Sequence, residues 1–192
     1  MKLLTSLTIA LAVPAVLAAQ QTPPAPVVNP ITAAFKSRIT AMHRNIAQAF
    51  DSIPEAKFGF KPTPAQLSIG FIAQHVASDD YLFCDQFGAK KASLPEKDTA
   101  TPDSVKATWP KDSLVAKLKA SFTFCQDAIG QLEDGKLADM VTLTFRGQSR
   151  EVPRISMVLG HVLDLADHYS QLANYMRLNG LIPPSALPRP RP

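Results

Sequence analysis

Residues 154–179 read RISMVLGHVLDLADHYSQLANYMRLN and carry the strongest helical pattern of the chain. Its apolar side chains recur every three or four positions, at Ile155, Val158, Leu159, Val162, Leu165, Leu172 and Met176. This spacing predicts an amphipathic α-helix with one face toward a core. Gly180 stands where helices favour a glycine just past their end, and Pro183 and Pro184 prevent the helix from continuing.

Three further stretches upstream show the same periodicity and are followed by residues that stop helices. They lie at residues 30–52, at residues 65–87 with a start between Ala65 and Ser68, and at residues 112–132 with Asp112 or Ser113 as N-cap. The polar residues 89–110 indicate a long surface connection, and alternation in 141–145 with a turn at 146–149 predicts a short hairpin. The sequence therefore predicts an all-α fold: a four-helix bundle with a long connection between helices 2 and 3 and a short hairpin-like segment before helix 4.

Composition narrows the class of protein. The chain has 192 residues, of which 46% are hydrophobic, so it fits one domain with a packed core. Two cysteines are too few for a disulfide scaffold or a zinc finger. Because a net charge of +4 comes without a basic stripe, we expect no nucleic-acid partner.

The first residues predict export. Residues 1–19 combine a basic start, an apolar run and small residues in a V-L-A cleavage pattern, which is typical of a signal peptide. The apolar run is shorter than the roughly 20 residues of a membrane-spanning helix, so we expect a periplasmic or extracellular protein with no membrane span in its mature form. A Pro-rich linker at 20–30, the bundle at 31–185 and an extended basic tail at 186–192 complete the predicted organisation.

Histidines and an aspartate mark the candidate site. At 100° per residue, His161, Asp164 and His168 fall within about 60° of arc on the core-directed face of the last helix. An Asp and a His at i, i+4 can bind one metal ion together, and His75, in the apolar stripe of the second helix, is the natural third ligand. The alternative interpretation is that these are hydrogen-bonded core or rim histidines, and for His43 a rim position is favoured.

The two cysteines, Cys84 and Cys125, fall on the second and third predicted helices. In an exported protein they are candidates for a disulfide, because neighbouring helices can meet the Cα separation of about 5.5–6 Å that the bond needs. The alternative is two small buried apolar side chains.

Two groups of short motifs carry a resemblance to a known family. The first group comprises FGFKPTP at 58–64, SIG at 68–70, QHVA at 74–77 and YLFC at 81–84. The second comprises FRG at 145–147, GHV at 160–162 and HYSQLANYMRLNGLIPPS at 168–185. On these residues the chain resembles the DinB-like (DinB/YfiT) family over residues 31–185. The resemblance implies a metal-binding four-helix bundle in which three histidines hold a divalent ion, nickel or zinc.

By position, the resemblance assigns His75 as the ligand on the second helix and His168 as the second ligand on the fourth. Asp164 stands where the family has the first histidine of that pair. The implied set has two histidines and one carboxylate, a legitimate combination for a divalent metal. His161, one turn earlier, is a candidate substitute for Asp164.

Two functions follow as hypotheses. The resemblance implies a divalent-metal-dependent enzyme acting on a small-molecule substrate, either a hydrolase or a thiol-dependent transferase. Because an exported protein meets little reduced thiol, the hydrolase is the easier variant. The alternative is a non-catalytic binding or stress-associated module that has lost the full ligand set. A homodimer is compatible with either hypothesis.

Overall fold

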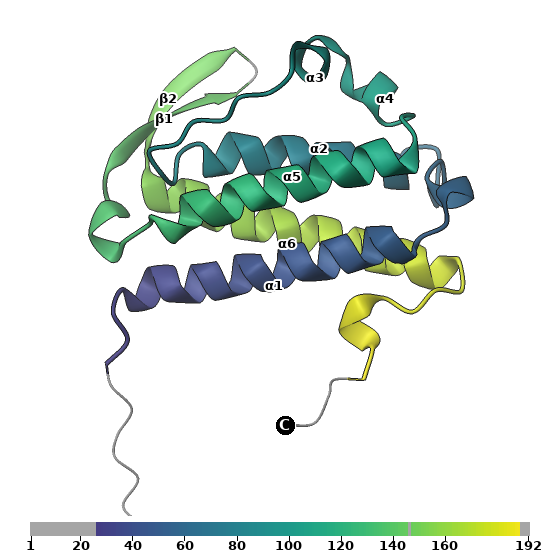
Figure 1. Ribbon diagram of the computed structural model, residues 1–192, viewed down its shortest axis with the longest axis horizontal. Helices are drawn as coiled ribbons and strands as arrows, with labels where there is room; N and C mark the ends of the chain where they lie inside the picture. The colour runs from purple at the N-terminus through teal and green to yellow at the C-terminus, as the bar shows by residue number, and fades with distance from the viewer. Residues whose placement is uncertain (1–25, 146, 189–192) are drawn as a thin grey trace, which may run out of the picture.

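The computed structural model describes residues 26–145 and 147–188, and these form a bundle of four long helices (Figure 1). The four helices are α1 (Pro30–Ser52), α2 (Ile69–Cys84), α5 (Lys111–Gly130) and α6 (Arg154–Leu178). The predicted fold class is therefore confirmed. The predicted signal peptide and residues 20–25 of the predicted linker lie outside the described residues, as does the end of the tail.

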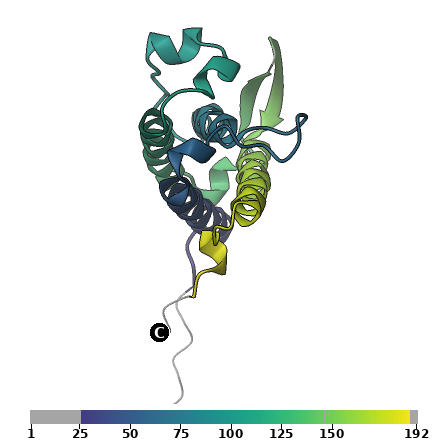
Figure 2. The same cartoon turned by 90° about the vertical axis from the view of Figure 1, so that its right-hand side faces the viewer.

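The four helices form a closed ring of contacts. Helices α1 and α2 each pack against both α5 and α6, and the view along the bundle shows this arrangement (Figure 2). The connection between α2 and α5 runs the length of the bundle, so these two helices are parallel, while α1 is antiparallel to α5 (Figure 1). The residues of α2 and α5 therefore meet level by level, with Asp80 beside Ser121 and Cys84 beside Cys125.

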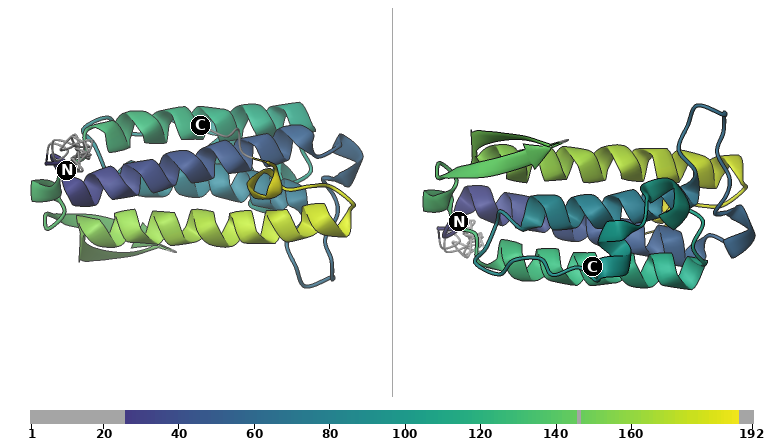
Figure 3. Two further views of the ribbon diagram at one scale, coloured as in Figure 1. Left: turned by 90° about the horizontal axis from the view of Figure 1, so that it is seen from below. Right: turned by 90° about the horizontal axis from the view of Figure 1, so that it is seen from above.

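The long connection contains two short helices that the sequence did not predict. These are α3 (Glu96–Ala100) and α4 (Asp103–Lys106), which lie over the bundle when it is seen from above (Figure 3). Each follows a proline and has an acidic residue in its first turn. Helix α4 packs on α2, where Gly70 leaves room for the carbonyl oxygen of Ala107.

The predicted hairpin is present before α6. Strands β1 (Met140–Phe145) and β2 (Gln148–Pro153) pair antiparallel, with Val141 opposite Val152 and Phe145 opposite Gln148. Gln148 and Ser149 therefore belong to the second strand and not to the turn. Gly147 has a φ of 76°, which glycine adopts without steric cost.

The helix ends differ by a few residues from the predicted ones. Helix α2 begins at Ile69, where the Ser68 hydroxyl accepts a hydrogen bond from the Phe71 N–H. Helix α5 begins directly after Pro110, so neither Asp112 nor Ser113 is its cap. Short 3-10 turns follow α1, α5 and α6, at Glu55–Lys57, Asp134–Lys136 and Pro184–Ala186.

The core fills the space between the four helices. Its fully buried side chains include Ile39 and Phe50 of α1, Ile72 of α2, Leu118 of α5 and Leu165 of α6. Among residues 26–145 and 147–188, none of the helices combines the length and the apolar character that a membrane crossing requires. Most of the apolar face predicted for α6 points inward, but Ile155 and Leu159 are exposed, at 36% and 47%.

Candidate metal centre

The structure brings His75, Asp164 and His168 together. His75 comes from α2, and Asp164 and His168 lie one turn apart on α6, which packs beside α2. Each residue offers a ligand atom, and these three atoms all lie within 4.8 Å of one another. The His75 and His168 rings are nearly perpendicular, with centroids 4.7 Å apart.

The spacing of these atoms suits a metal ion. The Nε2 atom of His168 lies 3.3 Å from Oδ1 of Asp164. Two ligands at about 2.1 Å from a tetrahedral ion lie about 3.4 Å from each other. Two of the three ligand atoms therefore already lie at the separation that a tetrahedral ion requires.

Two polar atoms at this site have no hydrogen-bond partner among the described residues. They are Oδ2 of Asp164 and Nδ1 of His168, and both are buried. A buried polar atom without a partner costs about 1–3 kcal/mol. A cation beside Asp164 would compensate its carboxylate, so the donor set fits a divalent metal. The shorter Asp side chain still reaches the site from the position where the family has a histidine.

Asp79, one turn after His75, adds a second carboxylate, and its Oδ2 lies 3.4 Å from Nε2 of His75. Burial, and after it the charge of Asp164, raise the pKa of Asp79 to about 7. Burial and the neighbouring His168 lower the pKa of His75. Burial also lowers the pKa of His168, but the hydrogen bond and charge of Asp164 outweigh it and raise this pKa overall. A cation would relieve the repulsion between the two carboxylates.

His161 does not join this site. It lies in a second, fully buried group with His43, Asp80 and Cys125. His161 and His168 share a helical face, but seven residues separate them, which is about 10.5 Å along the helix axis. The expectation that His161 replaces Asp164 therefore has no support in the arrangement. Their angles around the helix are similar, as the sequence indicated, but their positions along its axis differ.

The sequence favoured a rim position for His43, and the structure contradicts this. Its ring is buried and stacks on Phe122 with centroids 4.0 Å apart. Its Nε2 lies 3.3 Å from Oδ1 of Asp80, and its Nδ1 accepts a hydrogen bond from Gln126. Asp80 was missed because its partners, His43, Ser121 and His161, lie far from it in the sequence.

Cys84 and Cys125 form a disulfide, with Cα atoms 5.1 Å apart. Both cysteines are fully buried. The Nε2 atom of His161 lies 3.6 Å from the Cys84 sulfur and 3.4 Å from the Cys125 sulfur. Burial lowers the pKa of His161 to about 4, so its ring is neutral at physiological pH.

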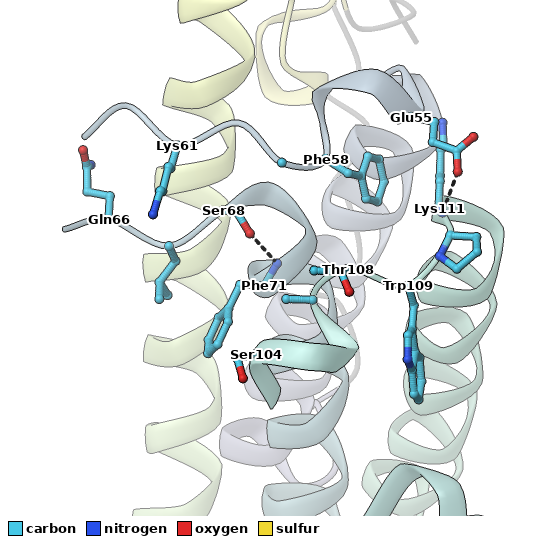
Figure 4. Close-up of a pocket in the computed structure, with 14 residues that line it drawn as sticks. Glu55, Phe58, Lys61, Gln66, Ser68, Phe71, Ser104, Thr108, Trp109 and Lys111 are labelled. Carbon is cyan, nitrogen blue, oxygen red and sulfur yellow. Dashed lines mark hydrogen bonds between the residues drawn. The ribbon is translucent and has the colours of Figure 1, made fainter. Parts of the chain in front are cut away.

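Two cavities lie near the candidate metal centre, although His75, Asp164 and His168 line neither of them. A cavity of about 380 Å³ is lined by Asp79 of α2 and Arg150 of β2, with Phe83 in its apolar wall. A second cavity, of about 690 Å³, lies at the start of α2 (Figure 4). Phe71 lines this second cavity, and its ring centroid is 6.0 Å from that of His75. Neither cavity could be predicted from sequence, because their walls come from distant segments.

The fold has relatives among solved structures, while no curated protein matches the chain. A DinB-like protein from Bacillus cereus is 18% identical with a TM-score of 0.60, over 79% of this chain and 95% of that one. A conserved protein from Enterococcus faecalis is 16% identical with a TM-score of 0.57, over 77% and 96%. A mycothiol-dependent maleylpyruvate isomerase is 15% identical with a TM-score of 0.57, over 77% and 63%.

The family comparison agrees with the bundle architecture. The model of the DinB superfamily matches residues 38–180, which run from within α1 to the end of α6. The matched region contains all the residues of both buried polar groups. It covers well over half of the sequence, and the chain belongs to the DinB superfamily.

Proposed function

We propose that this chain is a divalent-metal-dependent enzyme of hydrolytic type, with the metal held by His75, Asp164 and His168. One observation carries the proposal: the three ligand atoms lie within 4.8 Å of one another, and buried atoms of Asp164 and His168 lack hydrogen-bond partners among the described residues. A divalent ion bound there supplies Lewis acidity and lowers the pKa of a water molecule that it binds.

The surroundings suggest the class of substrate. The 380 Å³ cavity has apolar walls from Leu82, Phe83 and Leu143, and Arg150 lines it as well. A guanidinium favours carboxylate or phosphate groups. Asp79 lines this cavity and contacts His75, so a substrate held there lies next to the ligand set. A small molecule with an apolar body and an anionic group fits these walls.

A thiol-dependent transferase is the second candidate. It is favoured by the likeness to the mycothiol-dependent maleylpyruvate isomerase, which shares the fold at 15% identity. The disulfide and the N-terminal sequence favour hydrolysis, because both suit an oxidising compartment where small reduced thiols are scarce. A non-catalytic module is the third outcome, and it predicts neither bound metal nor turnover.

Metal analysis and activity together test the proposal. Protein purified without a histidine tag should contain close to one zinc or nickel ion per chain, and His168→Ala should contain almost none. Asp167→Ala is the matched control, because Asp167 is an exposed carboxylate on the same helix, paired with Gln171.

Hydrolysis of small anionic esters and amides should stop with a chelator and return with added metal. Metal-free parent protein would overturn the proposal, and bound metal with activity only in the presence of a small thiol would favour the transferase.

We also propose that the protein is exported. The full-length chain, expressed in a bacterium, should appear in the periplasm or medium with its N-terminus near residue 19 or 20. The matched control replaces Leu4, Leu7 and Leu11 by charged residues, which should leave the chain uncleaved in the cytoplasm. Cytoplasmic retention of the unchanged chain would contradict export.

A further inference from the structure

A second group of potential metal ligands lies in the dry core, in addition to the candidate metal centre. It comprises His43, Asp80, Cys125 and His161, all buried, whose ligand atoms lie within 4.8 Å of one another. These residues come from all four long helices. The sulfur of Cys125 is bonded to Cys84, so it has no thiolate to offer in this state.

The distances within this buried group resemble the edges of a metal polyhedron. Asp80 Oδ1 lies 3.3 Å from His43 Nε2 and 3.4 Å from His161 Nε2. His161 Nε2 lies 3.4 Å from the Cys125 sulfur. Ligands around a tetrahedral zinc ion lie about 3.4 Å apart when both are N or O, and about 3.6 Å apart when one is sulfur. Three of the distances between ligand atoms in such a site are therefore already present.

The charges of the group also match a zinc ion. Reduction would leave two neutral imidazoles, the Asp80 carboxylate and a Cys125 thiol that loses its proton to a metal. The charges of one Zn²⁺ ion and two negative ligands add up to a net charge of zero. This neutrality matters because Asp80 and His161 are completely buried, and an unbalanced buried charge is costly.

We propose that the Cys84–Cys125 disulfide gates a buried zinc site made of His43, Asp80, Cys125 and His161. The reduced protein binds one zinc ion there. Exchange with an external disulfide re-forms the Cys84–Cys125 bond and expels the ion, and the external disulfide becomes a dithiol with one proton from Cys84 and one from solvent. The site uses none of the three ligands of the candidate metal centre, so it stands independently of the proposed enzyme.

The gating reaction balances with a dithiol as reductant. The Cys84–Cys125 bond breaks and takes up two electrons and two protons, while the dithiol closes to its own disulfide. Zinc then displaces the proton of Cys125, which leaves to solvent. His43 binds through Nε2, so its ring proton moves to Nδ1, and the Gln126 amide turns to accept it in place of its present donation.

Two cysteine variants form the matched pair that tests the proposal. Both Cys84→Ser and Cys125→Ser abolish the disulfide, but only Cys84→Ser leaves the Cys125 ligand. Each is made together with His168→Ala, which removes a ligand of the candidate metal centre. After dialysis against Zn²⁺, the Cys84→Ser protein should retain one zinc ion per chain and the Cys125→Ser protein none. Equal zinc in the two proteins, whether one ion or none, overturns the proposal.

Reduction without any cysteine variant gives a second test, which remains informative if either variant fails to fold. The His168→Ala protein is treated with a phosphine, which becomes a phosphine oxide as the disulfide opens, and is then titrated with Co²⁺. We expect a thiolate-to-cobalt charge-transfer band only after reduction, and its loss when Asp80→Asn is added. Absence of the band in the reduced, folded protein overturns the proposal. Because His168→Ala is present throughout, neither test depends on whether the parent protein is a metalloenzyme.

Discussion

The Nε2 atom of His168 lies 3.3 Å from the carboxylate of Asp164, one turn earlier on α6. Asp164 is the position at which the chain departs from the three-histidine pattern that the family resemblance implies. The Asp164 side chain still reaches His168, so the proposed ligand set contains a carboxylate and keeps its place between α2 and α6. A carboxylate beside two histidines is a donor set that divalent metals accept.

Removal of the Asp164 carboxylate should weaken metal binding. In Asp164→Ala we expect zinc affinity to fall by about 100-fold or more, since even removal of outer-shell partners costs up to that factor. Asp164→His should restore tight binding by supplying the third imidazole. Competition with a chromophoric chelator measures both, and Asp167→Ala is the control. An unchanged affinity in Asp164→Ala would remove this residue from the ligand set.

The disulfide should contribute strongly to stability. Cys84 and Cys125 are 41 residues apart, and closing a loop of that length in the unfolded chain corresponds to about 4 kcal/mol. Urea unfolding of the protein with and without a phosphine reductant, in the presence of a chelator, should show a loss of this size. A loss below about 1 kcal/mol would contradict the estimate. In a separate experiment without the chelator, zinc added to the reduced protein should recover part of the loss.

Asp134 caps the first helix from a distant part of the chain. Its carboxylate accepts hydrogen bonds from the N–H groups of Ile31 and Thr32 at the start of α1. Desolvation raises the pKa of Asp134, but these hydrogen bonds together outweigh it and hold the pKa below the usual 3.8. The ionised form is thus favoured by folding, so its stabilising effect is present above pH 3.8 and is lost as the pH falls through the lowered pKa.

At pH 6, the Asp134→Ala protein should have a lower melting temperature than the parent. This difference should vanish once the pH is low enough to protonate Asp134 in the folded parent. Melting curves across the pH range measure this difference, and an NMR titration of Asp134 gives the pKa itself. A difference that grows on acidification would show that the sign is wrong.

Gly70 permits the contact between α2 and α4. A Cβ atom at this position would overlap the carbonyl oxygen of Ala107, and backbone cannot rotate away as a side chain can. Gly70→Ala should therefore destabilise the protein by about 1–3 kcal/mol. Gly59→Ala is the control, because a Cβ at Gly59 meets no atom within 4 Å. Equal unfolding free energies for the two variants would contradict the packing argument.

Periodicity and stop residues were sufficient to predict the four long helices and the hairpin. The short helices α3 and α4 were not predicted, because Pro95 and Pro102 indicate a loop equally well as a helix start. Only packing against α2 distinguishes the two readings for α4.

The candidate centre could be predicted because Asp164 and His168 share one turn of a strongly periodic helix. The buried group around Asp80 could not, because its partners His43, Ser121 and His161 come from three other helices. Angular position around α6 placed His161 with His168, although the rise of a helix over seven residues separates them by about 10.5 Å along its axis.

Anomalous diffraction at the zinc edge, from crystals of the oxidised protein grown with zinc, locates any metal bound by His75, Asp164 and His168. We expect one strong peak, about 2.0–2.2 Å from a ring nitrogen of each histidine and from a carboxylate oxygen of Asp164. A peak bound to other residues, or none at this site at full zinc saturation, would contradict this expectation.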